Sequence, residues 1–254
     1  MYDPCIVVVA EKADPLARAV VADLPDRGDR VLYVAPADLG SFPVMFGKGI
    51  FFARGCVVCG ILFRASYDNA FTVDFAEEDQ HFSAAEFGAL WLTALNCESV
   101  LAINRYDAEA WFEGYGWTVW RRRLIKEGIP VSPFSFGEDC TGGPRFWLPY
   151  TNTLIRPAPG GMSRRTLGTA LTGSKVKQTS LVVCGRVIAG ERYPCVVDTM
   201  DMLRDEGVRI AEIATDSEER VLFLNTRPAF TDTGLTDQAA TLIVEMFHAH
   251  LHLR

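Results

Sequence analysis

Residues 209–230 read RIAEIATDSEERVLFLNTRPAF. Two runs rich in apolar residues flank a short acidic turn, a pattern that predicts a β-hairpin. Glu212, Asn225 and Arg227 lie at the ends or on one face of these otherwise apolar strands. A hairpin that only packs against a core does not need polar groups there. We therefore expect the hairpin to present them to a ligand, and the rest of the chain to support it.

The beginning of the chain predicts a compact β-α-β unit. Residues 5–10 form a continuous apolar run that is typical of a strand buried on both faces. Asp14-Pro15 then provides a helix N-cap followed by proline, and the helix runs to Leu24. A second strand at residues 30–35 is expected to lie parallel to the first. The connecting loop, residues 11–14, lacks the glycines of a dinucleotide-binding fingerprint.

Residues 49–64 predict a β-meander that contains Cys56 and Cys59. A C-x-x-C spacing can mark a redox pair or half of a zinc site. A redox pair would begin a helix with an exposed sulfur, and the sequence has no second pair of cysteines or histidines at zinc-ligand spacing. We therefore interpret these cysteines as two thiols within a strand.

A third buried strand is predicted near residue 100, and it completes a small α/β domain. Ser83 and Glu86 have the spacing of a capping box, which predicts the start of a helix. The strand follows at residues 99–103 and ends in Asn104 and Arg105. Open α/β sheets place ligands at such strand ends. We expect a domain boundary here, with residues 1–104 before it and residues 105–254 after it.

The second half of the chain predicts an α+β arrangement. Asp107 can cap a helix that ends in a basic cluster near Lys126. A basic stretch rich in Ser, Thr and Gly follows at residues 163–177, and it suits either a phosphate-binding loop or a surface loop. A tight hairpin is predicted at residues 180–189. A final helix is predicted from Thr236 to Leu253. Its three histidines, at a spacing of two, lie on different sides of the helix and cannot share one metal ion there, so a frayed tail is favoured over a zinc site.

The composition excludes several classes of protein. The chain is 49% hydrophobic and 22% charged, as in an ordinary soluble globular protein. A net charge of −7 argues against a nucleic-acid-binding protein. The longest apolar runs, such as residues 56–63, are too short to span a membrane, and the first residues lack the pattern of a signal peptide. Seven scattered cysteines suit free thiols in a reducing cytoplasm.

Taken in order, these motifs resemble those of the ATP-grasp superfamily, and more narrowly the glutathione-synthetase-like ligases and the ligases that modify ribosomal peptides. The matching segments are Asn104-Arg105-x-Asp107, Leu124 to Val131, Ile155-Arg156-Pro157 with Gly160-Gly161, Val182 to Ala189, and the hairpin with its Glu212, Asn225 and Pro228. The resemblance implies a small pre-ATP-grasp α/β domain followed by a shortened ATP-grasp-like domain. Relatives of this kind are often dimers, so a homodimer is possible.

The resemblance also implies site residues. Arg156, Lys175, Lys177 and Arg186 would bind the phosphates of ATP. Glu212 and Asn225 would bind Mg²⁺, and Arg227 would bind the carboxylate of the substrate. Arg156 and Arg227 would thereby serve catalysis.

Two departures from the family pattern concern these nucleotide and metal motifs. Arg156 stands where the family has lysine. Arginine keeps the positive charge and can bind a phosphate through two hydrogen bonds, but its planar guanidinium is not interchangeable with an ammonium. Phe223 stands where the family has a glutamate that binds magnesium, and phenylalanine cannot bind a hard cation.

Two main functions therefore remain open, beside a third option of an enzyme that uses the fold without nucleotide. One is an ATP-dependent carboxylate–amine ligase that acts on a peptide or amino acid. In such an enzyme ATP would phosphorylate a carboxylate, and a nucleophile would displace the acyl phosphate. The other is a degenerate, non-catalytic protein, a pseudoenzyme, that keeps the fold, needs no cofactor, and binds a peptide or a partner protein. A further carboxylate beside Glu212 and Asn225, such as Asp198, Asp201 or Asp232, would favour the enzyme.

Overall fold

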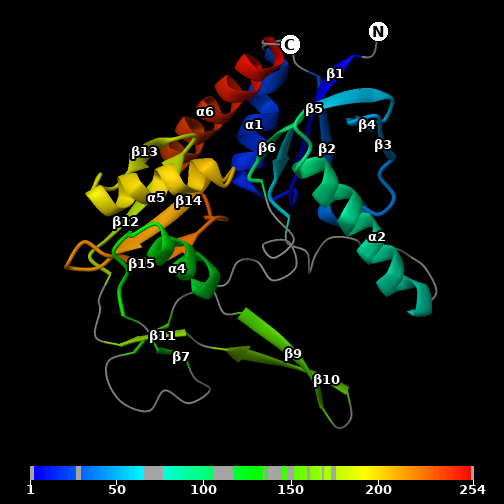
Figure 1. Cartoon of the computed structure of the whole chain (residues 1–254). Helices are drawn as coiled ribbons and strands as arrows, with labels where there is room; N and C mark the ends of the chain where they lie inside the picture. Colours follow the sequence, from blue (N-terminus) through cyan, green and yellow to red (C-terminus); the bar gives the residue numbers. More distant parts are fainter. Residues whose placement is uncertain are drawn as a thin grey trace.

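The structure of the chain, a computed structural model, has two main sheets with helices packed on their faces (Figure 1). It describes residues 3–26, 30–65, 77–105, 117–133, 135–136, 145–147, 152–158, 161–167, 169–172 and 176–252. The predicted mixed α/β fold class is confirmed.

The first sheet has the strand order β2-β1-β5-β4-β3, and β6 pairs with β5 beside β4. Its strands are β1 (Pro4–Val9), β2 (Val31–Val34), β3 (Val44–Gly47), β4 (Ile50–Ala53), β5 (Cys56–Phe63) and β6 (Leu101–Ile103). β1 is parallel to both β2 and β5, and α1 (Pro15–Asp26) connects β1 with β2. The predicted β-α-β unit is therefore confirmed. Cys56 and Cys59 are buried free thiols within β5, as expected.

The second sheet is antiparallel, with the order β13-β12-β14-β15. Its strands are β12 (Gln178–Val183), β13 (Arg186–Ala189), β14 (Ile210–Thr215) and β15 (Val221–Asn225). Both predicted hairpins are confirmed. Five further strands form two small sheets: β7 (Ser135–Phe136), β8 (Arg145–Trp147), β9 (Asn152–Ala158), β10 (Gly161–Leu167) and β11 (Thr169–Thr172).

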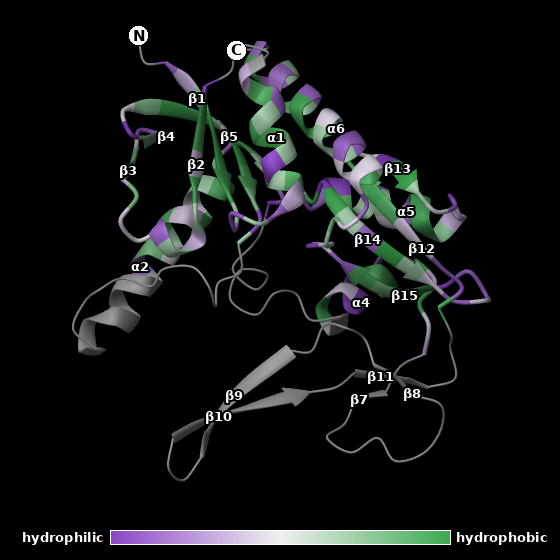
Figure 2. Ribbon diagram, turned by 180° about the vertical axis from the view of Figure 1, so that it is seen from behind, coloured by the Kyte–Doolittle hydropathy of each residue, from purple (hydrophilic) through white to green (hydrophobic). Residues whose placement is uncertain are grey.

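Two of the helices, α1 and α6 (Thr233–His252), pack against both main sheets. The other described helices are η1 (Pro36–Asp38), α2 (Glu77–Leu95), α4 (Trp117–Lys126) and α5 (Pro194–Asp205). α1 and α6 lie side by side and share one buried cluster with β1, β12 and β14 (Figures 1 and 2). At Gly60 a β-carbon would come within 2.6 Å of the Phe247 ring, so only glycine allows α6 to approach β5 this closely. α2 packs against the first sheet in a second cluster around Trp91, and α4 and α5 pack against β14 and β15 in a third.

Two helix boundaries differ from the predictions. α2 already includes Glu77, so Ser83 lies inside the helix and the capping-box prediction of its start is wrong. The residues before Ser83 are compatible with a helix, and a capping box marks a start only where they are not. α6 begins at Thr233, three residues before the predicted start, and it continues through His252, in agreement with the predicted helix to residue 253; the histidine tail is therefore helical and not frayed. The His248 and His252 rings lie one helical turn apart, with their centroids separated by 4.2 Å.

The turn between β14 and β15 is organised by the buried carboxylate of Asp216. Its Oδ1 accepts hydrogen bonds from the backbone N–H groups of Glu218 and Arg220, and its Oδ2 accepts hydrogen bonds from the Ser132 hydroxyl and the Arg220 guanidinium. Burial alone would raise the pKa of Asp216. The hydrogen bonds together lower it by more than burial raises it, so the pKa lies below its usual value of 3.8. The acidic turn thus anchors the hairpin to the segment that follows α4.

None of the helices in the described part of the chain combines the length and the apolar character that crossing a bilayer requires.

Candidate functional site

The β14–β15 hairpin brings together the two residues that were predicted to bind metal. Glu212 and Asn225 are directly opposite each other in the strand register, and Asn225 Nδ2 donates to Glu212 Oε2 over 3.3 Å. Asn225 Oδ1 accepts a hydrogen bond of 2.9 Å from the backbone N–H of Arg227. The side chain of Asn225 therefore connects the end of β15 to the carboxylate on β14.

Phe223 lies on the same face of the hairpin as Glu212 and Asn225. It is two residues before Asn225 and opposite Ala214, and strand alternation places such positions on one face. Phe223 is only 8% exposed. The position that would carry a central metal carboxylate in the family is thus filled by a buried aromatic ring.

A hollow of about 230 Å³ adjoins Glu212. Its walls come from β12, β13 and the segment that connects β15 to α6, including Phe230 and Asp232. Asp232 Oδ1 accepts a hydrogen bond of 2.9 Å from the backbone N–H of Leu235, so Asp232 caps α6. Asp232, which was named as a possible further carboxylate, therefore lines the same hollow as Glu212.

The donor set fits a magnesium ion only in part. Among the described residues, no three His, Cys, Asp or Glu side chains are grouped closely enough to hold a metal ion. Mg²⁺ is nevertheless commonly bound by one or two carboxylates together with phosphate oxygens and water. Asn225 Oδ1 keeps one lone pair beyond its bond to Arg227. Glu212 and Asn225 could thus hold Mg²⁺ only together with the phosphates of a nucleotide.

The remaining predicted residues do not converge on one place. Lys177 precedes β12, where its ammonium lies 3.6 Å from Glu219 Oε1 and 4.8 Å from the centre of the Tyr193 ring. Arg186 pairs with Val183 at the other end of β12. The strand rises by about 20 Å between these ends, at about 3.3 Å per residue. Arg186 also faces a different hollow from that of Glu212.

Arg156 and Lys175 were predicted to bind phosphate from the basic part of the chain. Arg156 belongs to β9, opposite Ser163 of β10, and its side chain lies outside the described structure. Lys175 lies outside the described residues altogether. The stretch that was predicted to be a loop contains the strands β10 and β11 over most of its length.

An ion pair that the sequence did not reveal positions one wall of the Glu212 hollow. Arg64 Nε lies 2.7 Å from Asp14 Oδ2, and the two side chains are only 10% and 15% exposed. Arg64 Nη2 donates to the Pro228 carbonyl over 3.0 Å, and its guanidinium lies 5.4 Å from the centre of the Phe230 ring. Arg64 directly follows β5, so the argument from strand ends could have identified it.

Asn104 has a structural role instead of the ligand-binding role that was expected from its place at a strand end. It is 3% exposed. Its Oδ1 accepts from the backbone N–H groups of Arg209 and Ile210, and its Nδ2 donates to the carbonyls of Ile210 and Thr226. The amide therefore pairs with both polar groups of Ile210 as a neighbouring strand would, and it joins the first sheet to the hairpin.

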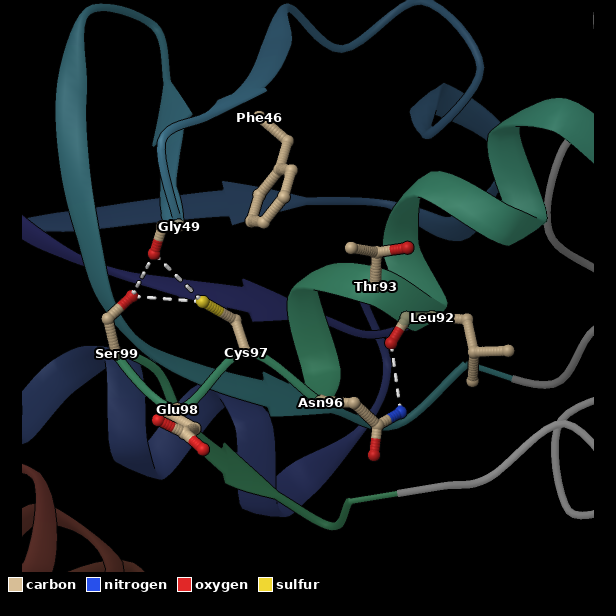
Figure 3. A pocket seen from close by; sticks show the side chains of 8 residues that line it. All are labelled: Phe46, Gly49, Leu92, Thr93, Asn96, Cys97, Glu98 and Ser99. Atoms are coloured by element: carbon tan, nitrogen blue, oxygen red, sulfur yellow. Dashed lines mark hydrogen bonds between the residues drawn. The ribbon is translucent and has the colours of Figure 1, made fainter.

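A further hollow, of about 680 Å³, lies between the β3–β4 turn and the end of α2 (Figure 3). The Cys97 thiol and the Ser99 hydroxyl both donate to the Gly49 carbonyl, and the ring of Phe46 forms another wall. None of the predicted site residues lines this hollow. The Glu212 hollow therefore remains the candidate site.

Solved structures of ATP-grasp ligases are similar to this chain over nearly its whole length. One is the ATP-grasp ligase PsnB complexed with the precursor peptide PsnA2 and AMPPNP, with a TM-score of 0.66, 18% identity and 98% of both chains covered. Another is the macrocyclase MdnC from Microcystis aeruginosa bound with its precursor peptide MdnA, with a TM-score of 0.65, 10% identity, and 97% of this chain and 99% of that chain covered.

A third is a RimK domain protein from Sphaerobacter thermophilus, with a TM-score of 0.55, 14% identity, and 95% of this chain and 98% of that chain covered. No protein-family model and no curated protein matches the sequence. At these identities the agreement establishes the fold, and the chain has the ATP-grasp fold. The fold that the sequence motifs implied is thereby confirmed.

Proposed function

We propose that this protein is an ATP-dependent carboxylate–amine ligase that acts on a peptide. The observation that carries the proposal is the pairing of Glu212 with Asn225 at a hollow that Asp232 also lines. This arrangement offers hard oxygen donors beside a space for substrate. Similar ligases have been solved with nucleotide and with precursor peptide, PsnB with AMPPNP or with Mg and ADP, and MdnC with MdnA.

In this proposal, residues of the chain bind and orient the reactants. Mg²⁺-bound ATP would supply the phosphoryl group that activates the substrate carboxylate. Glu212 and Asn225 would hold the metal ion, and Arg227, immediately after β15, would bind the substrate carboxylate. Positioning of this kind, together with neutralisation of charge, accounts for most catalysis of phosphoryl transfer.

The cationic residues Arg156, Lys175 and Lys177 would bind the phosphates. Arg186 is left out of the nucleotide site because it faces another hollow. Arg64 would act indirectly, since its contacts to Asp14 and Pro228 position the wall that carries Phe230 and Asp232.

A second function, a non-catalytic protein that binds a peptide or partner protein, is favoured by Phe223. This buried ring occupies the face on which a further metal ligand would be needed. Loss of a carboxylate weakens binding of magnesium because the ion depends on anionic oxygen ligands.

Nucleotide binding separates the two functions. In a thermal-shift titration with ATP and Mg²⁺, a hundredfold excess over Kd should add about 2.7 kcal/mol of stability. For a chain of this size that corresponds to an increase in Tm of roughly 5–10 °C. Glu212→Gln keeps the shape of the side chain and removes its charge, so it should abolish the magnesium-dependent part of the shift. Glu127→Gln, at an exposed residue after α4, is the matched control.

The ligase proposal requires that the wild-type protein and the control both show the shift and hydrolyse ATP slowly. Absence of any shift at millimolar nucleotide would exclude the ligase and leave the non-catalytic protein. ATP turnover that is lost in Glu212→Gln and kept in Glu127→Gln would exclude the non-catalytic protein.

A further inference from the structure

A third hollow, of about 550 Å³, is lined by arginine side chains and lies outside the proposed reaction site. Its walls are the β12–β13 turn, the end of α5, the start of β14 and the second half of α6. We call it the arginine hollow, and it is defined here by Arg186, Arg204, Arg209, Leu242, Glu245 and Met246. Its volume falls within the range of about 300–1,000 Å³ that is usual for ligand pockets.

The arginine hollow is separate from the Glu212 hollow. α6 begins at the Glu212 hollow, where Leu235 forms part of the wall, and contributes Leu242 to the arginine hollow. Seven residues of helix correspond to about 10 Å along the axis. A ligand in the arginine hollow would therefore not occupy the place proposed for the reacting groups.

The charge of the arginine hollow is opposite to that of the whole protein. Three arginines and one glutamate line it, which gives a charge of +2 with His250 neutral, whereas the chain carries −7. Arg204 forms ion pairs with Asp201 and Asp205. Within the described part of the chain, Arg186 forms no ion pair with a carboxylate and is exposed at the mouth of the hollow. Positive charge concentrated in a concave site attracts anionic ligands.

Keeping Arg209 charged in its partly buried position is unfavourable for the protein alone. Arg209 is half-buried, and its Nη1 donates to the Arg204 carbonyl over 2.9 Å. Burial is the main cause that lowers the pKa of Arg209; Cys184 opposes this effect, Arg105 and Arg204 add to it, and Asp205 opposes it. A carboxylate bound at Arg209 would compensate part of the cost of burying its charge.

The other wall of the hollow is apolar, and this wall restricts the kind of anion. Leu242 is buried, Met246 is half-buried, and Leu101 and Ala249 lie beside them. Inorganic phosphate would leave this wall without a partner. A peptide can place a carboxylate on a guanidinium, which binds it through paired hydrogen bonds, and an apolar side chain on the leucine and methionine.

We propose that the arginine hollow binds an acidic peptide segment in which a carboxylate side chain lies next to an apolar side chain. The binding itself needs neither nucleotide nor metal. Only the identity of the peptide as a substrate rests on the proposed ligase function. The site would hold part of a peptide away from the reacting carboxylate and so contribute to the choice of substrate.

The test uses the full-length protein and a fluorescein-labelled peptide of alternating leucine and aspartate, and it follows binding by fluorescence anisotropy without nucleotide. We expect saturable binding that is weakened about tenfold by Arg186→Glu, since a charge is reversed where a carboxylate should dock. Arg18→Glu, an identical charge change at an exposed residue of α1, should weaken it less than about threefold. Equal melting temperatures of both variants would show that each is folded.

Two control peptides separate the parts of the recognition. A peptide with asparagine in place of aspartate should lose most of its affinity, and so should one with glycine in place of leucine. Unchanged affinity of either control peptide would overturn the proposal. Equal losses of affinity in Arg186→Glu and Arg18→Glu would overturn it too. So would displacement of the labelled peptide by pyrophosphate as effectively as by the same peptide without the label. Peptide binding without any thermal shift by nucleotide would count against the ligase alone, whereas a nucleotide shift without peptide binding would count against the arginine hollow alone.

Discussion

Replacing Asn104 by alanine removes a buried amide that joins the first sheet to the β14–β15 hairpin. The side chain makes four hydrogen bonds of 2.7–2.8 Å to backbone groups of residues 209, 210 and 226. Alanine makes none of them. The backbone N–H groups of Arg209 and Ile210 therefore lose the acceptor that Asn104 provides.

The expected cost follows from these lost partners. A buried donor without an acceptor costs about 1–3 kcal/mol, so two donors correspond to about 4 kcal/mol. The carbonyls of Ile210 and Thr226 also lose a donor, which adds to the cost. We expect the free energy of unfolding of Asn104→Ala to fall by about 4 kcal/mol, and Tm by roughly 10 °C for a chain of this size.

Equilibrium unfolding in urea measures this change, and Asn96→Ala is the matched control. Asn96 is exposed, and its Nδ2 donates to the Leu92 carbonyl over 2.9 Å within the last turn of α2. Its replacement should cost less than about 1 kcal/mol because water can take over an exposed hydrogen bond. A loss of stability in Asn104→Ala that is no greater than in Asn96→Ala would refute the role of Asn104 as a joint between the sheets.

Three further predictions concern other buried polar groups. Arg64→Met should lower the free energy of unfolding by about 3 kcal/mol because it leaves the carboxylate of Asp14 largely buried without its cationic partner. Arg30→Met, at an exposed ion pair, should lower it by less than about 1 kcal/mol. Equal losses of the two variants in urea unfolding would contradict this prediction. The pKa of Asp216 is depressed in the folded state, so its stabilisation should be complete above about pH 4 and disappear as the pH falls through the folded pKa. Unfolding free energies measured from about pH 6 to pH 3 should therefore fall more steeply for the wild type than for Asp216→Asn, and parallel curves would disprove the assignment. Burial raises the pKa of Cys195 to about 11, so little of the reactive thiolate is present at about pH 8. Mass spectrometry should therefore find Cys195 unmodified by iodoacetamide until urea unfolds the protein. Rapid labelling of Cys195 in the native protein would contradict this.

Local sequence patterns were sufficient for the elements whose signals come from neighbouring residues. The apolar run of β1, the cap at Asp14 and the second strand predicted the β-α-β unit correctly. The turn residues between apolar runs predicted both hairpins of the second sheet. The sequence placed Glu212 and Asn225 at the ends or on one face of β14 and β15, and the strand register then showed that they lie directly opposite each other.

Only the tertiary structure decided which polar residues face the same space. Asn104 and Arg64 both follow buried strands, but they have different roles. The side chain of Asn104 makes four hydrogen bonds to the backbone, and Arg64 donates a hydrogen bond to the Pro228 carbonyl. Lys177 and Arg186 are close in sequence, yet they lie at opposite ends of β12 because the extended strand separates them. The roles of Asn104 and Arg64 depend on hydrogen bonds to segments more than 100 residues away, and the pattern of neighbouring residues does not specify such contacts.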